Sequence, residues 1–230
     1  MKKTYVLGDI HGRYKALISL LRKINFNYDE DFLIFLGDIL DRGEEPFECI
    51  SEILKIKNRI LICGNHDSNF FEFTQTGHDG FNGHNGVYIT KKCWREASEE
   101  TRQMALQFFH EQRPYYVDEQ KRIFTHGGFN RLVNIEDQPS HVFAWDRELF
   151  NKAMSCSDKQ TLKTEDGFSK VFIGHTPTQI WNLDIPIYAG NLVWNLDTGA
   201  GYDSGKLTIM DVNTEEYWQS ESIAELYENQ

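Results

Sequence analysis

The sequence is poor in cysteine, in basic residues and in long apolar runs, and each deficit excludes a class of protein. Its four cysteines form no CxxC pair, so neither a thiolate metal site nor a disulfide framework is expected. Acidic residues number 35 against 24 basic ones, and the resulting net charge of -11 disfavours nucleic acid and anionic membranes as partners. No apolar run approaches the ~20 residues that span a bilayer, and the first apolar run is too short for a signal peptide. We therefore expect a cytoplasmic protein.

What remains is an ordinary globular composition, with 40% hydrophobic and 13% aromatic residues in 230. A chain of this length is expected to fold as a single domain, residues 1–230, with a sizeable core. The sequence does not indicate an oligomeric state.

Short apolar runs alternate with amphipathic segments in the N-terminal part of the chain. The runs 4–8 and 31–38 predict buried strands, and 59–67 predicts a third strand with its exit loop. The segments 13–24 and 46–56 have the apolar spacing of helices. This alternation is typical of βαβ units, whose strands are parallel.

The pattern then changes, because residues 68–114 are rich in Gly, Asn and aromatic residues and include a helical run at 95–112. We interpret residues 68–114 as a helical cap or lid inserted between strands. Two further apolar runs, 122–128 and 170–177, carry histidines near their ends, and the last third alternates strand runs with turns as antiparallel strands do.

Polar side chains follow the glycine that ends nearly every predicted strand. Because function collects at the carboxyl ends of strands in α/β sheets, we expect these side chains to converge. All offer oxygen or nitrogen donors, which suit Mn, Fe or Zn. Six donors exceed what one ion usually takes, whereas two ions that share a carboxylate would use them and are common in phosphoester hydrolysis. The donors are Asp9, His11, Asp38, Asn65, His126 and His175.

The motifs GDIHG, GDILDRG, GNHD, THGG and GHTP lie between Gly8 and Pro177. In kind and order they resemble the five blocks of PPP-type serine/threonine phosphatases, within the calcineurin-like metallophosphoesterases. The small size and compact cap resemble the bacterial and phage branch. The resemblance implies an α/β (α+β sandwich) fold with two mixed β-sheets flanked by helices and a metal site at the carboxyl ends of strands. One departure is Asp67, where many protein phosphatases of this family have glutamate.

The resemblance also implies a role for each motif residue. Asp9, His11 and Asp38 would hold a first metal ion, and Asp38 would bridge to a second one completed by Asn65, His126 and His175. His66 would be the catalytic acid and Asp41 would orient it. Arg42, Arg147 of the run FAWDREL and Asn65 would bind the substrate phosphate. We expect Asp67 to orient a neighbour by hydrogen bonding.

The expected activity is metal-dependent hydrolysis of phosphate monoesters by direct attack of a hydroxide that bridges two divalent ions. Mn2+ is the expected metal, with Fe or Zn as alternatives. The expected substrate is a phosphoprotein, at serine or threonine, or a small phosphoester. A symmetrical dinucleoside tetraphosphate hydrolase, another small-molecule phosphoesterase and a phosphate-binding module without turnover remain alternatives, because the motif residues contact only phosphate. The roles of the cap and of His78 and His84 stay open.

Overall fold

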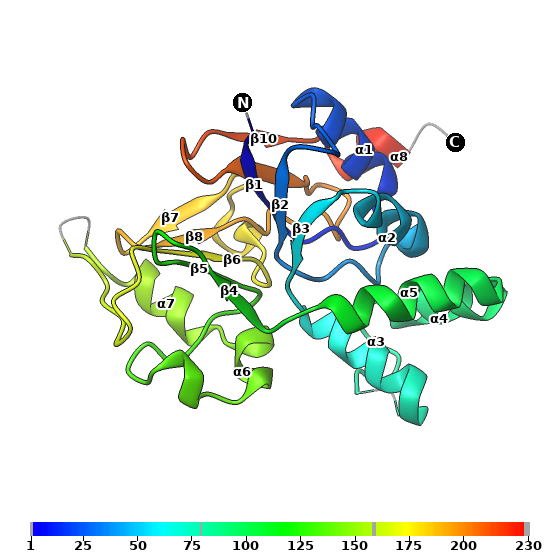
Figure 1. The fold of residues 1–230 in the computed structure, drawn as a ribbon, viewed down its shortest axis with the longest axis horizontal. Helices are drawn as coiled ribbons and strands as arrows, with labels where there is room; N and C mark the ends of the chain where they lie inside the picture. Colours follow the sequence, from blue (N-terminus) through cyan, green and yellow to red (C-terminus); the bar gives the residue numbers. More distant parts are fainter. Residues whose placement is uncertain (1, 79, 158–159, 228–230) are drawn as a thin grey trace.

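We analysed a computed structural model that describes residues 2–78, 80–157 and 160–227. Two five-stranded sheets pack face to face, and helices cover their outer faces (Figure 1). This arrangement confirms the predicted sandwich of two mixed sheets flanked by helices.

The first sheet has the strand order β10-β9-β1-β2-β3. Its strands are β1 (Thr4–Leu7), β2 (Phe32–Phe35), β3 (Asn58–Leu61), β9 (Thr208–Asp211) and β10 (Tyr217–Gln219). The pairs β1–β2 and β2–β3 are parallel, whereas β9 is antiparallel to both β1 and β10. The predicted N-terminal βαβ units are therefore confirmed.

The second sheet has the strand order β4-β5-β6-β8-β7. Its strands are β4 (Tyr115–Val117), β5 (Arg122–Thr125), β6 (Lys170–Ile173), β7 (Ile187–Ala189) and β8 (Val193–Asn195). The pairs β5–β6 and β6–β8 are parallel, and β4 and β7 are antiparallel edge strands. The predicted antiparallel pairing in the last third is confirmed for β8 with β7 and for β9 with β10. The other edge of β8 is parallel to β6, because the chain returns from β7 to lie between these two strands.

The described residues also form eight α-helices and two short 3-10 helices. The α-helices are α1 (Tyr14–Lys23), α2 (Pro46–Leu54), α3 (Asn65–Thr76), α4 (Val87–Glu96), α5 (Glu99–Glu111), α6 (Ser140–Trp145), α7 (Glu148–Met154) and α8 (Ile223–Tyr227). The 3-10 helices are η1 (Ile135–Asp137) and η2 (Thr178–Trp181).

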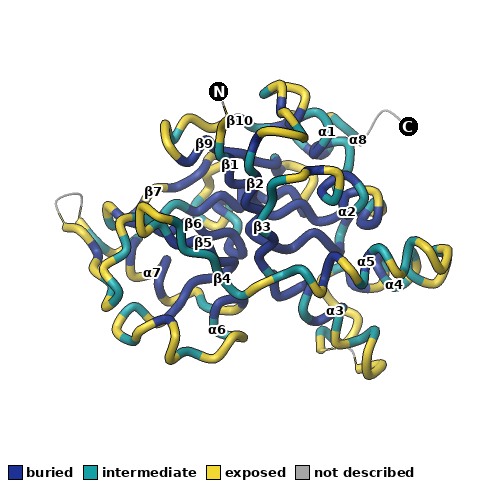
Figure 2. The backbone as a smooth tube through the Cα atoms, viewed as in Figure 1, coloured by how far each residue is buried: buried dark blue, intermediate teal, exposed yellow. Residues whose placement is uncertain are grey.

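The period-2 alternation of the strands builds three hydrophobic layers. In β1, Tyr5 and Leu7 face the layer shared with α1, α2 and α5, whereas Val6 points into the layer between the sheets. In the second sheet Phe124 and Phe172 enter that middle layer and stack with ring centroids 4.9 Å apart. The buried backbone accordingly runs through the strands in the centre of Figure 2.

Two predicted segments divide differently in the structure. The run 59–67 holds the predicted strand, β3, which ends at Leu61, but the exit loop is short because Asn65 already begins α3. The helical run 95–112 is two helices, because Ser98 starts a new one by accepting a hydrogen bond from the amide of Thr101.

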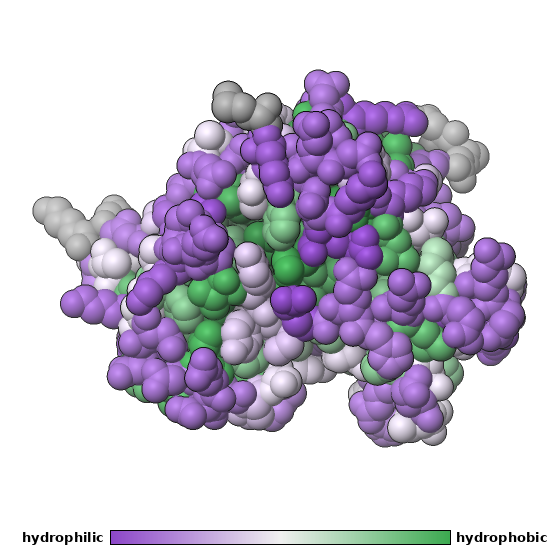
Figure 3. Space-filling model, in the orientation of Figure 1, coloured by the Kyte–Doolittle hydropathy of each residue, from purple (hydrophilic) through white to green (hydrophobic). Residues whose placement is uncertain are grey.

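Hydrophilic side chains dominate the face shown in Figure 3, with small hydrophobic areas between them. None of the described helices is long and apolar enough to cross a membrane.

Candidate metal centre and phosphate pocket

The six predicted metal ligands lie at the carboxyl ends of parallel strands from both sheets, and all are buried. Their positions are Asp9 and His11 after β1, Asp38 after β2, Asn65 at the start of α3, His126 after β5 and His175 after β6. The face-to-face packing of the sheets brings these loops together, so the structure places the six side chains in one region.

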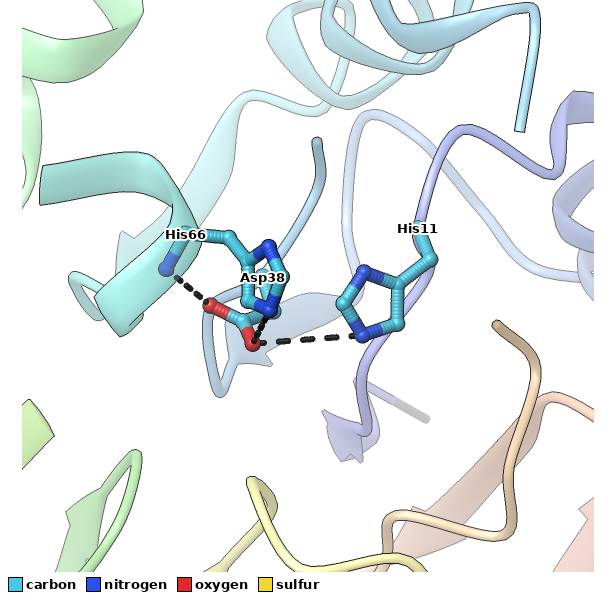
Figure 4. Close-up of side chains that lie close together, drawn as sticks. All are labelled: His11, Asp38 and His66. Atoms are coloured by element: carbon cyan, nitrogen blue, oxygen red, sulfur yellow. Dashed lines mark hydrogen bonds and ion pairs between the residues drawn. The ribbon is translucent and has the colours of Figure 1, made fainter. Parts of the chain in front are cut away.

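Asp38 lies at the centre of a first compact group with His11 and His66. The Nε2 atoms of both histidines are 3.9 Å from Asp38 Oδ2, and both rings face the carboxylate in Figure 4. The other oxygen, Oδ1, accepts the backbone amide of His66 at 3.0 Å. The Asp38 carboxylate is therefore fixed by α3 on one side and open to imidazoles on the other.

A second compact group joins Asp38 to His126 and His175. His126 Nδ1 lies 2.9 Å from the Leu36 carbonyl oxygen, so this nitrogen carries the proton and Nε2 points the other way. Nε2 is 3.2 Å from Asp38 Oδ2 and 3.0 Å from Asn65 Oδ1. These three atoms are all acceptors when the imidazole is neutral, so either a proton on Nε2 or a metal cation has to lie among them.

The convergence of these acceptor atoms fits a metal ion at the site. A proton on His126 Nε2 satisfies the two oxygens in the metal-free chain, and a divalent cation would satisfy all three atoms. His175 Nε2 is buried without a hydrogen-bond partner among the described residues, as an unliganded metal donor would be. The oxygen and nitrogen donors fit two ions such as Mn2+, Fe or Zn.

Asp9 is arranged differently from the other predicted ligands. Its carboxylate accepts the amide of His175 at 3.0 Å, and it belongs to neither compact group. Gly174 allows this approach, because a Cβ there would lie 2.0 Å from Asp9 Oδ1. Burial and the nearby Asp197 raise the pKa of Asp9 well above its usual value.

The charges around Asp38 are strongly coupled. Burial alone would raise the pKa of Asp38, but the histidines, His126 first, outweigh burial and hold that pKa well below its usual range. Burial opposes a charged imidazole at His126, yet Asp38 and Asp9 raise its pKa to about 9. Burial and the neighbouring His126 lower the pKa of His175 to about 2. In the metal-free chain His126 is therefore the protonated imidazole and His175 a neutral one.

The predicted acid and its partner form a short pair beside the metal groups. His66 Nδ1 lies 2.6 Å from Asp41 Oδ2, and both side chains are buried. This contact places the proton on Nδ1 and directs Nε2 towards Asp38 and the pocket. Next to it, Arg42 Nη1 donates to His11 Nε2 at 2.7 Å, and its guanidinium stacks on Tyr202 at 4.7 Å.

A pocket of about 660 Å³ opens above these groups. Arg147 reaches it from the start of α7 and donates to Thr176 Oγ1 at 2.7 Å. The lining residues include Asp38, Arg42, Asn65, His66, Phe81, Trp145, Arg147, His175, Ile180 and Tyr202. The structure thus brings both predicted phosphate-binding arginines to the predicted acid, whereas His78 and His84 are exposed and do not line this pocket.

Several residues that support the site could not be assigned a partner from the sequence. Asp67 accepts the amides of Asp38 and Ile39 at 3.0 Å each, which is the orienting hydrogen bonding expected of it. Thr90 of α4 contacts Asp41 across 49 residues. Asp197 follows β8, is buried, and lies close enough to Asp9 to raise the pKa of Asp9. The signal for Asp197 was present, because it follows an apolar run and precedes Thr-Gly, much as Asp9 follows a strand.

Comparisons with known proteins agree with these motifs. A profile of the calcineurin-like phosphoesterases matches residues 2–216. Serine/threonine-protein phosphatase 2 of Salmonella typhimurium is 36% identical over 118 residues, which are 50% of this chain and 51% of that protein. The matched segment therefore spans about half the length of this relative. Serine/threonine-protein phosphatase 1 of the same organism is 25% identical over 214 residues, 90% and 91% of the two chains.

A second kind of relative matches equally well. An asymmetrical bis(5'-nucleosyl)-tetraphosphatase of Anoxybacillus flavithermus is 25% identical over 230 residues, 89% of this chain and 88% of that protein. Among solved structures, one provisionally assigned to a diadenosine tetraphosphatase has a TM-score of 0.68 at 16% identity and covers 95% of this chain and 92% of that chain. The structural likeness shows the fold, and the relatives leave the substrate unresolved.

Proposed function

The chain belongs to the calcineurin-like phosphoesterase family, and from this premise we propose that it is a serine/threonine protein phosphatase. Enzymes of this family are hydrolases that cleave phosphoesters. The observation that carries the proposal is a single pocket that holds Asp38, the paired acid His66 and two arginines.

The metal ligands of this proposal are Asp9, His11, Asp38, Asn65, His126 and His175. Two divalent cations held there would act as Lewis acids on the phosphoryl oxygens and lower the pKa of the attacking water. We take Mn2+ as the first ion to test.

The chain's own side chains then bind and orient the phosphate. Arg42 and Arg147 neutralise its oxygens, and a guanidinium can do so with two parallel hydrogen bonds. Arg42 donates to His11 Nε2, the nitrogen that would hold a metal, so with a metal at that nitrogen the guanidinium would be available to the phosphate. Asn65 contacts His126 of the second metal group and also lines the pocket.

His66 is the proposed proton donor to the leaving oxygen. Its Nδ1 proton is held by Asp41, so the ring is fixed in one orientation with Nε2 on the pocket side. A general acid contributes about 10²–10⁴-fold to the rate of such a step. Asp41 does not contact the phosphate and acts by positioning His66.

The rim of the pocket supports a protein substrate. The exposed fractions of Trp145, Ile180 and Tyr202 are 47%, 63% and 46%, so the mouth is lined by exposed side chains rather than closed. An open mouth admits a phosphorylated side chain that projects from a protein surface.

Dinucleoside tetraphosphate hydrolysis is the second candidate, and the same rim supports it. Phe81 and Trp145 lie with ring centroids 5.7 Å apart beside the pocket, and Tyr202 adds a third ring. Aromatic side chains stack on nucleobases with about 1–3 kcal/mol per base. A binding module without turnover has less support, because the complete set of ligands, acid and arginines would be superfluous for binding alone.

Turnover by metal-stripped protein tests the proposal. The stripped chain is reloaded with Mn2+, Zn2+ or Mg2+ and offered 4-nitrophenyl phosphate, a phosphoserine peptide and diadenosine tetraphosphate, with Asp38→Asn as the control. The proposal expects metal-dependent release of phosphate from the peptide that is lost in Asp38→Asn. Turnover of the dinucleotide without the peptide would instead select the second candidate, and bound metal without turnover of any ester would select the binding module.

A further inference from the structure

Thr90 of the helical cap is tied to the predicted catalytic pair by two hydrogen bonds. Its Oγ1 accepts the backbone amide of Asp41 at 2.9 Å and donates to Asp41 Oδ1 at 2.6 Å. Thr90 is fully buried, although much of α4 around it is exposed (Figure 2). Both the acceptor and the donor of this buried hydroxyl are therefore used by one residue, Asp41.

With the Thr90 hydroxyl, each oxygen of the Asp41 carboxylate has a hydrogen-bond partner. One oxygen accepts from Thr90 and the other lies 2.6 Å from His66 Nδ1. The terminal torsion of an aspartate is broad and two-fold, so a carboxylate with one partner can turn away from it. The contact with Thr90 fixes this torsion and keeps one Asp41 oxygen on the His66 ring.

The rest of α4 packs against the same loop. A Cβ at Gly86 would lie 2.6 Å from the backbone nitrogen of Arg42, and Cys93 Sγ contacts the carbonyl oxygen of Glu44 at 3.5 Å. Gly86 directly precedes α4, and Thr90 and Cys93 lie three residues apart on one face of the helix. One face of α4 therefore lies along residues 41–44, which carry the predicted positioning acid and a phosphate-binding arginine.

We propose that Thr90 is a positioning residue for phosphoester cleavage, and that the cap holds the Asp41–His66 pair in place through it. The inference rests on the proposed function, in which His66 donates a proton to the leaving oxygen. When the leaving group is poor this proton decides the rate, and when it is good the proton matters little. A loss of positioning must therefore depend on the leaving group.

The test compares Thr90→Val, which keeps the shape and removes the hydroxyl, with Thr90→Ser, which keeps the hydroxyl. Metal-loaded enzymes hydrolyse phenyl phosphate, with a poor leaving group, and 4-nitrophenyl phosphate, with a good one. We expect Thr90→Val to lower kcat about tenfold or more on phenyl phosphate and less than about threefold on the nitro ester, because it removes only part of the ~10²–10⁴-fold contribution of a general acid. Thr90→Ser restores the wild-type ratio. Metal content per chain stays unchanged.

A His66→Asn enzyme provides the second arm. On that background Thr90→Val should have no further effect, because residues that act through one group are not additive. Equal losses on the two esters would show a merely structural role for Thr90 and overturn the inference. It is overturned as well if Thr90→Val matches the wild type, or if its loss persists in full on the His66→Asn background.

Failure of the proposed function gives a different result. If the wild type cleaves both aryl esters but not a phosphoserine peptide, protein phosphatase activity is excluded. The ratio of kcat on the two aryl esters still tests whether Thr90 positions the acid.

Discussion

Gly64→Ala is expected to disable the site through one methyl group. Gly64 precedes α3 with φ -83° and ψ 168°, a backbone conformation that any residue adopts. A Cβ there would nevertheless lie 2.0 Å from Asp38 Oδ1 and 2.3 Å from the Asp38 backbone nitrogen. The substitution therefore tests crowding of the central carboxylate without backbone strain.

The displacement follows from these distances. Ordinary van der Waals contact begins at 3.4 Å, so the 2.0 Å approach requires Asp38 Oδ1 or the α3 backbone to move by about 1.4 Å. A misplacement of ~1 Å in an active site costs about 10²-fold in rate, which is about 2.7 kcal/mol of transition-state stabilisation. Overpacking costs about 1–3 kcal/mol of unfolding free energy, against a gain of about 0.4–1 kcal/mol from the less flexible unfolded chain.

The assay measures kcat on 4-nitrophenyl phosphate at saturating metal, metal ions per chain and the midpoint of thermal unfolding. Gly77→Ala is the matched control, because Gly77 ends the same helix at φ 76° and a Cβ there meets nothing within 4 Å. The control should lose about 1 kcal/mol of stability from left-handed backbone strain and keep its kcat. A Gly64→Ala enzyme within threefold of the wild-type kcat, or a control that loses as much activity, would refute the reasoning.

Three further predictions follow from single contacts. The pKa of His126 is about 9 when folded and metal-free and near 6.5 when unfolded, so its stabilising charge is fully present below pH 6.5 and is lost as pH rises through 9. Metal loading at pH 7.5 must expel this proton, and calorimetry in two buffers of different ionisation enthalpy should detect its release; equal heats would contradict the protonated His126. Tyr202→Leu should raise KM for 4-nitrophenyl phosphate about two- to fivefold, since stacking of Arg42 contributes about 0.5–1 kcal/mol, while Tyr202→Phe should leave KM unchanged in steady-state kinetics. Asp67→Asn should lower the unfolding free energy by about 1–3 kcal/mol in a denaturant titration, because the amide group leaves one of the Asp38 and Ile39 backbone donors unpaired; an unchanged midpoint would show that neither bond matters.

Much of the fold could be predicted because the βαβ units are local. The strands β1, β2 and β3 follow from apolar runs, and Pro46 in the first turn gives the start of α2. The position of β8 could not be predicted in this way. Its pairing with β6 depends on the tertiary path of the chain, and a three-residue strand carries no signal of its neighbour's direction.

The candidate site shows the same division between local and distant information. The carboxyl ends of strands predicted where the six proposed ligand residues gather, and the structure places these residues there. The supporting residues Asp41 and Asp67 are held by partners that are distant in sequence, Thr90 and Gln112 respectively. A buried threonine in a helix looks like any core residue until the loop that it contacts is placed.

The backbone itself gives an argument for function that needs no relative. His11, Asp38, Asp41, Arg42 and His175 all have φ between 51° and 69°, where L side chains are strained. Such residues cost about 1–3 kcal/mol each, a notable share of the roughly 5–15 kcal/mol that stabilises a domain. Glycine would adopt these turns without strain, and the chain does use it beside them, at Gly12 and Gly37. The other described non-glycine residues with positive φ are five asparagines, Lys121 and Glu215. Among the described residues, aspartate, histidine and arginine therefore adopt this conformation only at the site, where their side chains carry the proposed chemistry.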